Sequence, residues 1–179
     1  SPNEFRMALR EFIQAGQSDK LILDLRGNPG GFLNAAVDMA SWFLPAGKVI
    51  VTEDYRNNGG DVVHRSKGYD IFNDQLKFAI LVNQGSASAS EILAGALQEH
   101  GKAVVVGAKT FGKGSVQELA EITNETSLKV TVAKWLTPKG VSISDGGITP
   151  DVEVEMTIED FEAGRDPQLD KAIEILVSL

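Results

Sequence analysis

The sequence predicts a single α/β domain, and three observations support this prediction. Short apolar runs, of the length of strands, alternate with longer segments in which apolar residues recur at helical spacing. Their order gives strand–helix–strand units followed by a region rich in strands, which favours one mixed β-sheet flanked by helices. The 179 residues are enough for one domain with a sizeable core, and they contain no repeat, low-complexity tract or linker.

The N-terminal part of the sequence predicts a helix, a buried strand and a second helix. Asn3 is expected to cap the first helix, because its side chain can accept a hydrogen bond from a free backbone N–H. Residues 21–25 form a short apolar run typical of a buried strand. The second helix is predicted over about 33–44, because Pro45 cannot continue it.

A hairpin and a second strand–helix–strand unit follow. The hairpin is predicted over residues 48–65, with its turn at Asn57-Asn58-Gly59-Gly60. The remaining elements are, in order, a strand at 78–82, a helix at 88–100, a strand at 103–106, an antiparallel pair at 116–122 and 127–136, and a last helix capped by Asp166.

Composition narrows the possible functions. The net charge of −8 without a basic block argues against binding to nucleic acid or to an anionic membrane surface. The absence of cysteine excludes disulfides and thiolate metal sites, and the acidic residues show no metal-ligand spacing. We therefore expect neither a metal nor a cofactor.

Ser88 opens the segment GSASASEILAGAL directly after a predicted strand. One interpretation is structural, since Ser88-Ala89-Ser90-Glu91 fits the Ser-x-x-Glu capping box. The other is catalytic, because N–H groups at a helix start stabilise developing negative charge beside a nucleophile. On local sequence alone, Ser86 and Ser90 are equally available.

Lys113 lies between two glycines after the next predicted strand, and a serine beside a lysine can act as nucleophile and base without histidine. A lysine that acts as a base must lose its proton, and burial in an apolar site lowers the pKa of a lysine. Gln117 is neutral and is placed to hold the amine. Lys109 is in the same loop, and local sequence does not separate the two lysines.

Adjacent glycines end the loop Arg26-Gly27-Asn28-Pro29-Gly30-Gly31, which follows the strand at 21–25. This loop is expected either to form a tight turn or to present a backbone N–H as a second oxyanion donor, and it can do both.

Two other patterns point to sites that we do not expect. Residues 107–113 match the G-x-x-x-x-G-K pattern of nucleotide-binding loops, but Gly114 stands where Ser or Thr is needed for Mg²⁺, so no nucleotide is expected. His64 and His100 have no neighbouring Asp arrangement that suggests a triad.

Five motifs in one order resemble the carboxyl-terminal processing (tail-specific) proteases, the S41 serine peptidases. These motifs are LILDLRGNPGG, LVNQGSASASEILAGAL, KTFGKGSVQ, WLTPKGVSI and GGITPDVEVE. The resemblance implies that Ser88 is the nucleophile, that Lys113 is the general base and that Gln117 positions the lysine. It also implies oxyanion donors at the backbone of Ala89 and of Gly30 or Gly31.

The same resemblance implies a ClpP/crotonase-like fold and one catalytic core over residues 1–179, without the PDZ domain and N-terminal helical segment of the family. The implied activity is a serine endopeptidase that forms an acyl-enzyme and cleaves proteins or peptides near accessible C-termini. An extracytoplasmic location is implied as well. The alternative is a non-catalytic module on the same fold that binds a ligand or protein.

Overall fold

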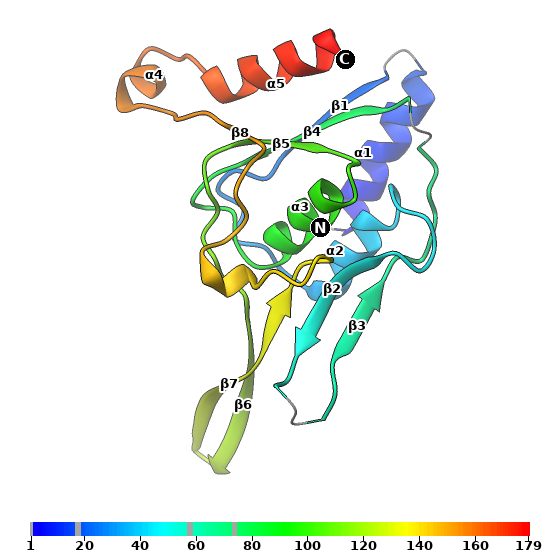
Figure 1. Cartoon of the computed structure of the whole chain (residues 1–179). Coiled ribbons are helices and arrows are strands. Elements are labelled where there is room, and N and C mark those ends of the chain that lie inside the picture. The colour runs from blue at the N-terminus through cyan, green and yellow to red at the C-terminus, as the bar shows by residue number, and fades with distance from the viewer. Residues whose placement is uncertain (1, 17–18, 57–58, 73–74) are drawn as a thin grey trace.

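The computed structural model describes residues 2–16, 19–56, 59–72 and 75–179, and these residues confirm the α/β class (Figure 1). The strands divide into two four-stranded sheets rather than joining in one. The parallel sheet has the order β1 (Lys20–Asp24), β4 (Lys77–Val82), β5 (Val104–Gly107) and β8 (Val152–Glu153). The antiparallel sheet has the order β3 (Val62–Arg65), β2 (Val49–Asp54), β7 (Thr126–Leu136) and β6 (Ser115–Thr123).

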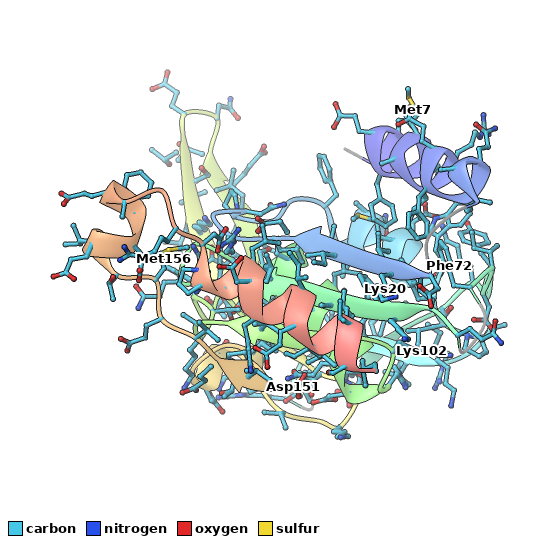
Figure 2. All side chains as sticks on the ribbon, turned by 90° about the horizontal axis from the view of Figure 1, so that it is seen from above. Met7, Lys20, Phe72, Lys102, Asp151 and Met156 are labelled. Carbon is cyan, nitrogen blue, oxygen red and sulfur yellow. The ribbon has the colours of Figure 1, made fainter. Side chains whose placement is uncertain are left out.

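Helices cover both faces of the parallel sheet. Figures 1 and 2 show α5 (Pro167–Ser178) across one face, while α2 (Leu33–Ala40) and α3 (Ala89–Glu99) lie on the other. Strand β4 is buried along residues 78–82, because its alternating side chains enter two separate apolar clusters. A strand covered on both faces is an unbroken apolar run, which explains why the sequence signal for β4 is strong.

The parallel register brings three loops to one edge of the sheet. Asp24 pairs with Leu81, and Val82 pairs with Gly107, so β1, β4 and β5 end at the same level. After β1 the chain enters residues 26–31, the glycine loop. After β4 it enters residues 83–88, the Ser88 turn, and after β5 it enters residues 108–114, the lysine loop. Carboxyl ends of parallel strands are a common place for ligand sites.

Two helix boundaries differ from the prediction. Helix α1 (Pro2–Ala15) already includes Asn3 in its first turn, so the expectation that Asn3 caps it was wrong; proline suits a first turn because its N–H is not needed there. Helix α2 ends at Ala40, four residues before Leu44. The chain then turns, which lets Phe43 stack on Phe72 and Phe78 in the core.

Other elements agree with the prediction or were missed. Strands β2 and β3 form the expected hairpin, although Asn57 and Asn58 of its turn lie outside the described residues. Asp166 caps α5 by accepting the Leu169 N–H at 3.0 Å. Three short elements were not predicted from the sequence: β8, a 3₁₀ helix η1 (Ile143–Asp145) and α4 (Ile158–Glu162), although a capping box of Thr157 and Asp160 marks the start of α4.

Candidate active site

Ser88 occupies a strained turn between β4 and α3. Its backbone angles are φ 56° and ψ −120°, and it is one of three non-glycine residues with positive φ in the described part of the chain. Such a conformation costs about 1–3 kcal/mol, and strain of this kind clusters at functional sites. A sharp strand-to-helix turn with a serine at its tip is also the arrangement that presents a nucleophile in α/β-hydrolases.

Ser88 and Glu91 form the capping box that the sequence predicts. The Glu91 carboxylate accepts the Ser88 N–H at 2.8 Å, as a capping box requires. Ser88 therefore has the structural role that the pattern predicts, and this role leaves its chemical role open to test.

Glu91 is fully buried and accepts four hydrogen bonds from neutral donors. Its Oε1 accepts the Thr110 hydroxyl at 2.6 Å and the Gly112 N–H at 2.7 Å. Its Oε2 accepts the N–H groups of Ser88 at 2.8 Å and of Lys113 at 2.9 Å. Both N–H groups donate to the same oxygen, Oε2 of Glu91. The backbone nitrogens of Ser88 and Lys113 therefore lie within two hydrogen-bond lengths of each other.

The structure thus brings together two segments that the sequence singled out separately. Sequence reasoning identified Glu91 only as the fourth residue of a capping box. Its bonds to residues 110–113 are long-range, and the sequence carried no signal for them beyond the capping box itself.

The glycines around Lys113 are required by close packing. A Cβ on Gly114 would lie 2.3 Å from the Ser144 nitrogen, and Gly112 has a φ of 87°. The segment that carries η1 therefore packs against the loop around Lys113 and determines the backbone conformation of that loop. Only glycine tolerates contacts this close.

The side chains of Lys113 and Gln117 are placed differently from the expectation. Lys113 is exposed rather than buried in an apolar site. Gln117 is also exposed, on β6 opposite Thr131. In the part of the chain that the structure describes, no hydrogen bond joins Gln117 to Lys113.

The glycine loop packs directly on the Ser88 turn. Gly30 has a φ of 89°, and a Cβ there would lie 2.4 Å from the Ala87 oxygen and 2.7 Å from the Ala89 nitrogen. The Gly30 N–H donates to the Asn28 side chain at 3.0 Å. The Gly31 N–H makes no hydrogen bond among the described residues. As the first residue of α3, Ala89 has no intrahelical acceptor for its own N–H.

Arg26 ties the start of this loop to α5. Its guanidinium donates to Asp24 at 2.7 Å, to both Asp166 oxygens at 2.8 Å, and to Gln168 at 3.1 Å. The hydrogen bonds that Arg26 donates to Asp24 and Asp166 raise the pKa of Arg26, and the same bonds lower the pKa of the Asp166 carboxyl. Sequence reasoning missed this network because its partners are separated by about 140 residues.

The other candidate sites have structural explanations. A strand, β6, follows Lys113 where a nucleotide-binding loop needs a helix. His64 pairs with Glu53 in the hairpin sheet at 2.6 Å, and His100 bonds to the Val49 carbonyl oxygen at 2.7 Å. Among the described residues, no group of three or more His, Asp or Glu side chains is placed to hold a metal ion. None of the described helices is long and apolar enough to cross a membrane.

Comparison with known families gives a match over most of the chain. The model of peptidase family S41 matches residues 1–154. A carboxy-terminal-processing protease of Bartonella bacilliformis is 38% identical over 170 residues, which cover 93% of this chain and 39% of the relative. A probable CtpA-like serine protease of Staphylococcus aureus (strain COL) is 42% identical over 176 residues, which cover 89% of this chain and 34% of the relative.

Solved structures give the same result. The photosystem II D1 C-terminal processing protease superposes with a TM-score of 0.75 at 33% sequence identity, over 86% of this chain and 39% of that one. Mature CPAF bound to lactacystin superposes with a TM-score of 0.76 at 13% identity, which is a likeness of fold. The chain spans between a third and two fifths of the length of the two sequence relatives described above.

Proposed function

Because this chain belongs to peptidase family S41, we propose that it is a serine endopeptidase with Ser88 as nucleophile and Lys113 as general base. The observation that carries the proposal is the shared Glu91 oxygen, which holds the backbones of Ser88 and Lys113 side by side at the edge of the parallel sheet. The strained conformation of Ser88 supports the same assignment. Residues 1–179 are proposed to act as one unit, since the lysine loop runs from the parallel sheet into the antiparallel sheet.

The proposed reaction has two stages. In the first, the Ser88 oxygen attacks the peptide carbonyl carbon while its proton passes to the neutral amine of Lys113. The carbon–nitrogen bond breaks, the leaving amine takes that proton, and an ester to Ser88 remains. In the second stage, water attacks the ester, Lys113 accepts the water proton and returns it to the Ser88 oxygen, and the acid product leaves.

The oxyanion formed in each stage needs donors aimed at it. The proposed donors are the backbone N–H groups of Ala89 and Gly31, which have no acceptor among the described residues. Gly30 is the weaker candidate, because its N–H already donates to Asn28. The role of Gly30 is instead to let the loop approach the Ser88 turn. Gln117 stays a proposed partner of Lys113, reached only when the exposed lysine swings toward β6.

The proposed substrates are proteins or peptides cut near an accessible C-terminus. The support for this is the relatives, whose names describe carboxy-terminal processing and a C-terminal processing protease. A peptide with a free C-terminal carboxylate should therefore be cleaved faster than the same peptide with an amidated end. An extracytoplasmic location, which the family resemblance implies, is part of the same proposal.

The dyad is tested by three variants in one peptidase assay. Ser88→Ala should abolish turnover and labelling by a fluorophosphonate probe. Lys113→Arg should be inactive as well, because arginine stays protonated and cannot accept the serine proton. The matched control is Lys109→Ala, which changes the other lysine of the loop and should keep near-parental rates. Unchanged turnover in Ser88→Ala or in Lys113→Arg contradicts the assignment.

The alternative function is a non-catalytic binding module on this fold. It predicts that peptides bind without being cut and that the probe does not label Ser88. The exposed position of the Lys113 side chain is the observation in its favour. Labelling of Ser88 together with peptide cleavage would exclude it.

A further inference from the structure

One side-chain oxygen joins the glycine loop to the Ser88 turn. Asn83 directly follows β4, which lies between β1 and β5 in the parallel sheet (Figure 1). Its Oδ1 accepts the Gly27 N–H at 2.8 Å and the Gly85 N–H at 2.9 Å. We propose that Asn83 is a positioning residue, which fixes the glycine loop against the Ser88 turn and so sets the distance between the two N–H groups that hold the oxyanion. The inference rests on the proposed peptidase function.

The two hydrogen bonds come from opposite sides of the contact. Gly27 belongs to the glycine loop, and Gly85 belongs to the turn. Their backbones touch, because a Cβ on Gly85 would lie 2.7 Å from the Gly27 Cα. The two bonds also use the full accepting capacity of the Asn83 oxygen, since a carbonyl oxygen has two lone pairs. The side chain of Asn83 therefore bridges the two segments at a point where their backbones are in contact.

The contact continues from this bridge to the proposed oxyanion donors. The Ala87 N–H donates to the Asn28 carbonyl oxygen at 3.0 Å. Further along, a Cβ on Gly30 would lie 2.7 Å from the Ala89 nitrogen. The glycine loop and the turn therefore run side by side, and Asn83 fixes the start of this contact. A shift of the loop at the bridge would move the donor on the loop relative to the donor at the end of the turn.

The backbone of Asn83 is itself held in place by a buried serine. The Asn83 N–H donates to the Ser86 hydroxyl at 3.0 Å, and this hydroxyl donates to the Leu25 carbonyl oxygen at 2.8 Å. The Asn83 carbonyl oxygen accepts the Ser86 N–H at 2.9 Å. Ser86 is fully buried. Asn83 is therefore tied to the core, and a side chain supported in this way can hold another group in a fixed position.

Other side chains of the glycine loop do not make this bridge. Asn28 accepts the Gly30 N–H at 3.0 Å, which shapes the loop from within. Arg26 bonds to Asp24 and to α5. Among the described residues, Asn83 is the one whose side chain bonds to both the loop and the turn. The relative position of the two segments should therefore be sensitive to this one side chain.

The first test compares Asn83→Ala with Asn83→Asp in peptide cleavage. Alanine removes the acceptor of both N–H groups, whereas a carboxylate keeps it. The kcat of Asn83→Ala should fall about a hundredfold with KM nearly unchanged, because a displacement of about 1 Å at an oxyanion donor costs about that much and the oxyanion exists only beyond the ground state. Asn83→Asp should stay within about tenfold of the parent, since only its charge opposes the oxyanion.

The matched control is Asn124→Ala, which makes the same change in the exposed turn between β6 and β7 and should keep parental rates. Circular dichroism checks that each variant is folded. If Asn83→Ala does not fold, Asn83→Ser takes its place, because the shorter hydroxyl side chain cannot accept both N–H groups. Hydrogen exchange at the Gly27 and Gly85 amides should be faster in Asn83→Ala and parental in Asn83→Asp.

A binding measurement separates a loss of position from a loss of folding. A peptidyl boronate forms a tetrahedral adduct with Ser88 and places an oxygen where the oxyanion forms, whereas the product peptide does not. Asn83→Ala should bind the boronate about a hundredfold more weakly and should bind the product peptide with a parental dissociation constant. A variant that is only less stable would change both dissociation constants by the same factor.

The inference is overturned if Asn83→Ala matches Asn124→Ala in kcat and in boronate binding. It is also overturned if Asn83→Asp is as inactive as Asn83→Ala, because the shared acceptor would then not be the cause. Failure of the proposed function has a different result, since the parent itself would neither cut peptides nor bind the boronate at Ser88. An active parent with an unaffected Asn83→Ala removes the inference alone and leaves the peptidase function standing.

Discussion

Replacing Glu91 by glutamine tests whether one buried carboxylate holds the candidate site together. Glutamine keeps one oxygen but turns the other into a donor, so one or two backbone N–H groups lose their acceptor, while the Thr110 hydroxyl can reverse and accept. Each bond to a charged acceptor contributes about 1.5–3 kcal/mol, so the loss of one or two of them should lower the free energy of unfolding by about 1.5–6 kcal/mol. This is a large part of the about 5–15 kcal/mol that stabilises a typical domain.

Glu91→Gln should reduce peptide turnover even under conditions where the variant is still folded. The amide either loses the Gly112 N–H bond, next to Lys113, or loses both the Ser88 and the Lys113 N–H bonds. Either loss loosens the lysine loop, and a displacement of about 1 Å at a catalytic group costs about a hundredfold in rate. Urea unfolding followed by circular dichroism gives the stability, and peptide turnover gives the rate. Hydrogen exchange of the Gly112 and Lys113 amides reports directly on the loop and does not depend on activity.

Glu99 supplies a matched control in the same helix. It accepts the Thr137 hydroxyl at 2.7 Å and the Lys139 N–H at 2.7 Å, and so holds a turn away from the site. Glu99→Gln should reduce stability by less and leave turnover and the exchange of the lysine loop as in the parent. The reasoning is refuted if Glu91→Gln matches the parent in urea midpoint and in exchange at Gly112 and Lys113.

Three further predictions concern the framework of the site. Gly30→Ala should abolish activity and destabilise the fold, because its Cβ would lie 2.4 Å from the Ala87 backbone oxygen. Gly31→Ala has open space around its Cβ and should fold normally, and equal melting temperatures of the two variants would contradict this prediction. Burial favours the neutral form of Asp38, but hydrogen bonds from its cationic and tyrosine partners outweigh burial and lower the pKa of this carboxyl from 3.8 to about 2. It should therefore add at most about 2 kcal/mol of stability above pH 4, lost as the pH falls toward 2, so that the stability gap between the parent and Asp38→Asn narrows over this range; a constant gap contradicts this. Arg26→Gln removes the cation that lowers the pKa of Asp166, so α5 amides should exchange faster at neutral pH, and unchanged exchange would show that the helix does not depend on this tie.

The sequence was informative wherever a local pattern carries its own physical cause. The run at 78–82 is apolar because β4 is covered on both faces, so its pattern predicted a buried strand without knowledge of its neighbours. Asp166 before Pro167 predicted the start of α5 for the same reason, since a cap is satisfied within one turn. Ser88 and Lys113 stood out because small residues surround each of them at the end of a strand.

Only the tertiary structure decided how these segments meet. Three contacts join residues that are far apart in the chain: the bonds from Glu91 to residues 110–113, the approach of Gly30 to Ala87, and the ion pair of Arg26 with Asp166. No local pattern specifies them. The division into two sheets likewise follows from pairing between distant strands. Propensities and periodicities act within a few residues, whereas a site depends on distances across the fold, and those distances are fixed by packing and by the need to satisfy buried polar groups.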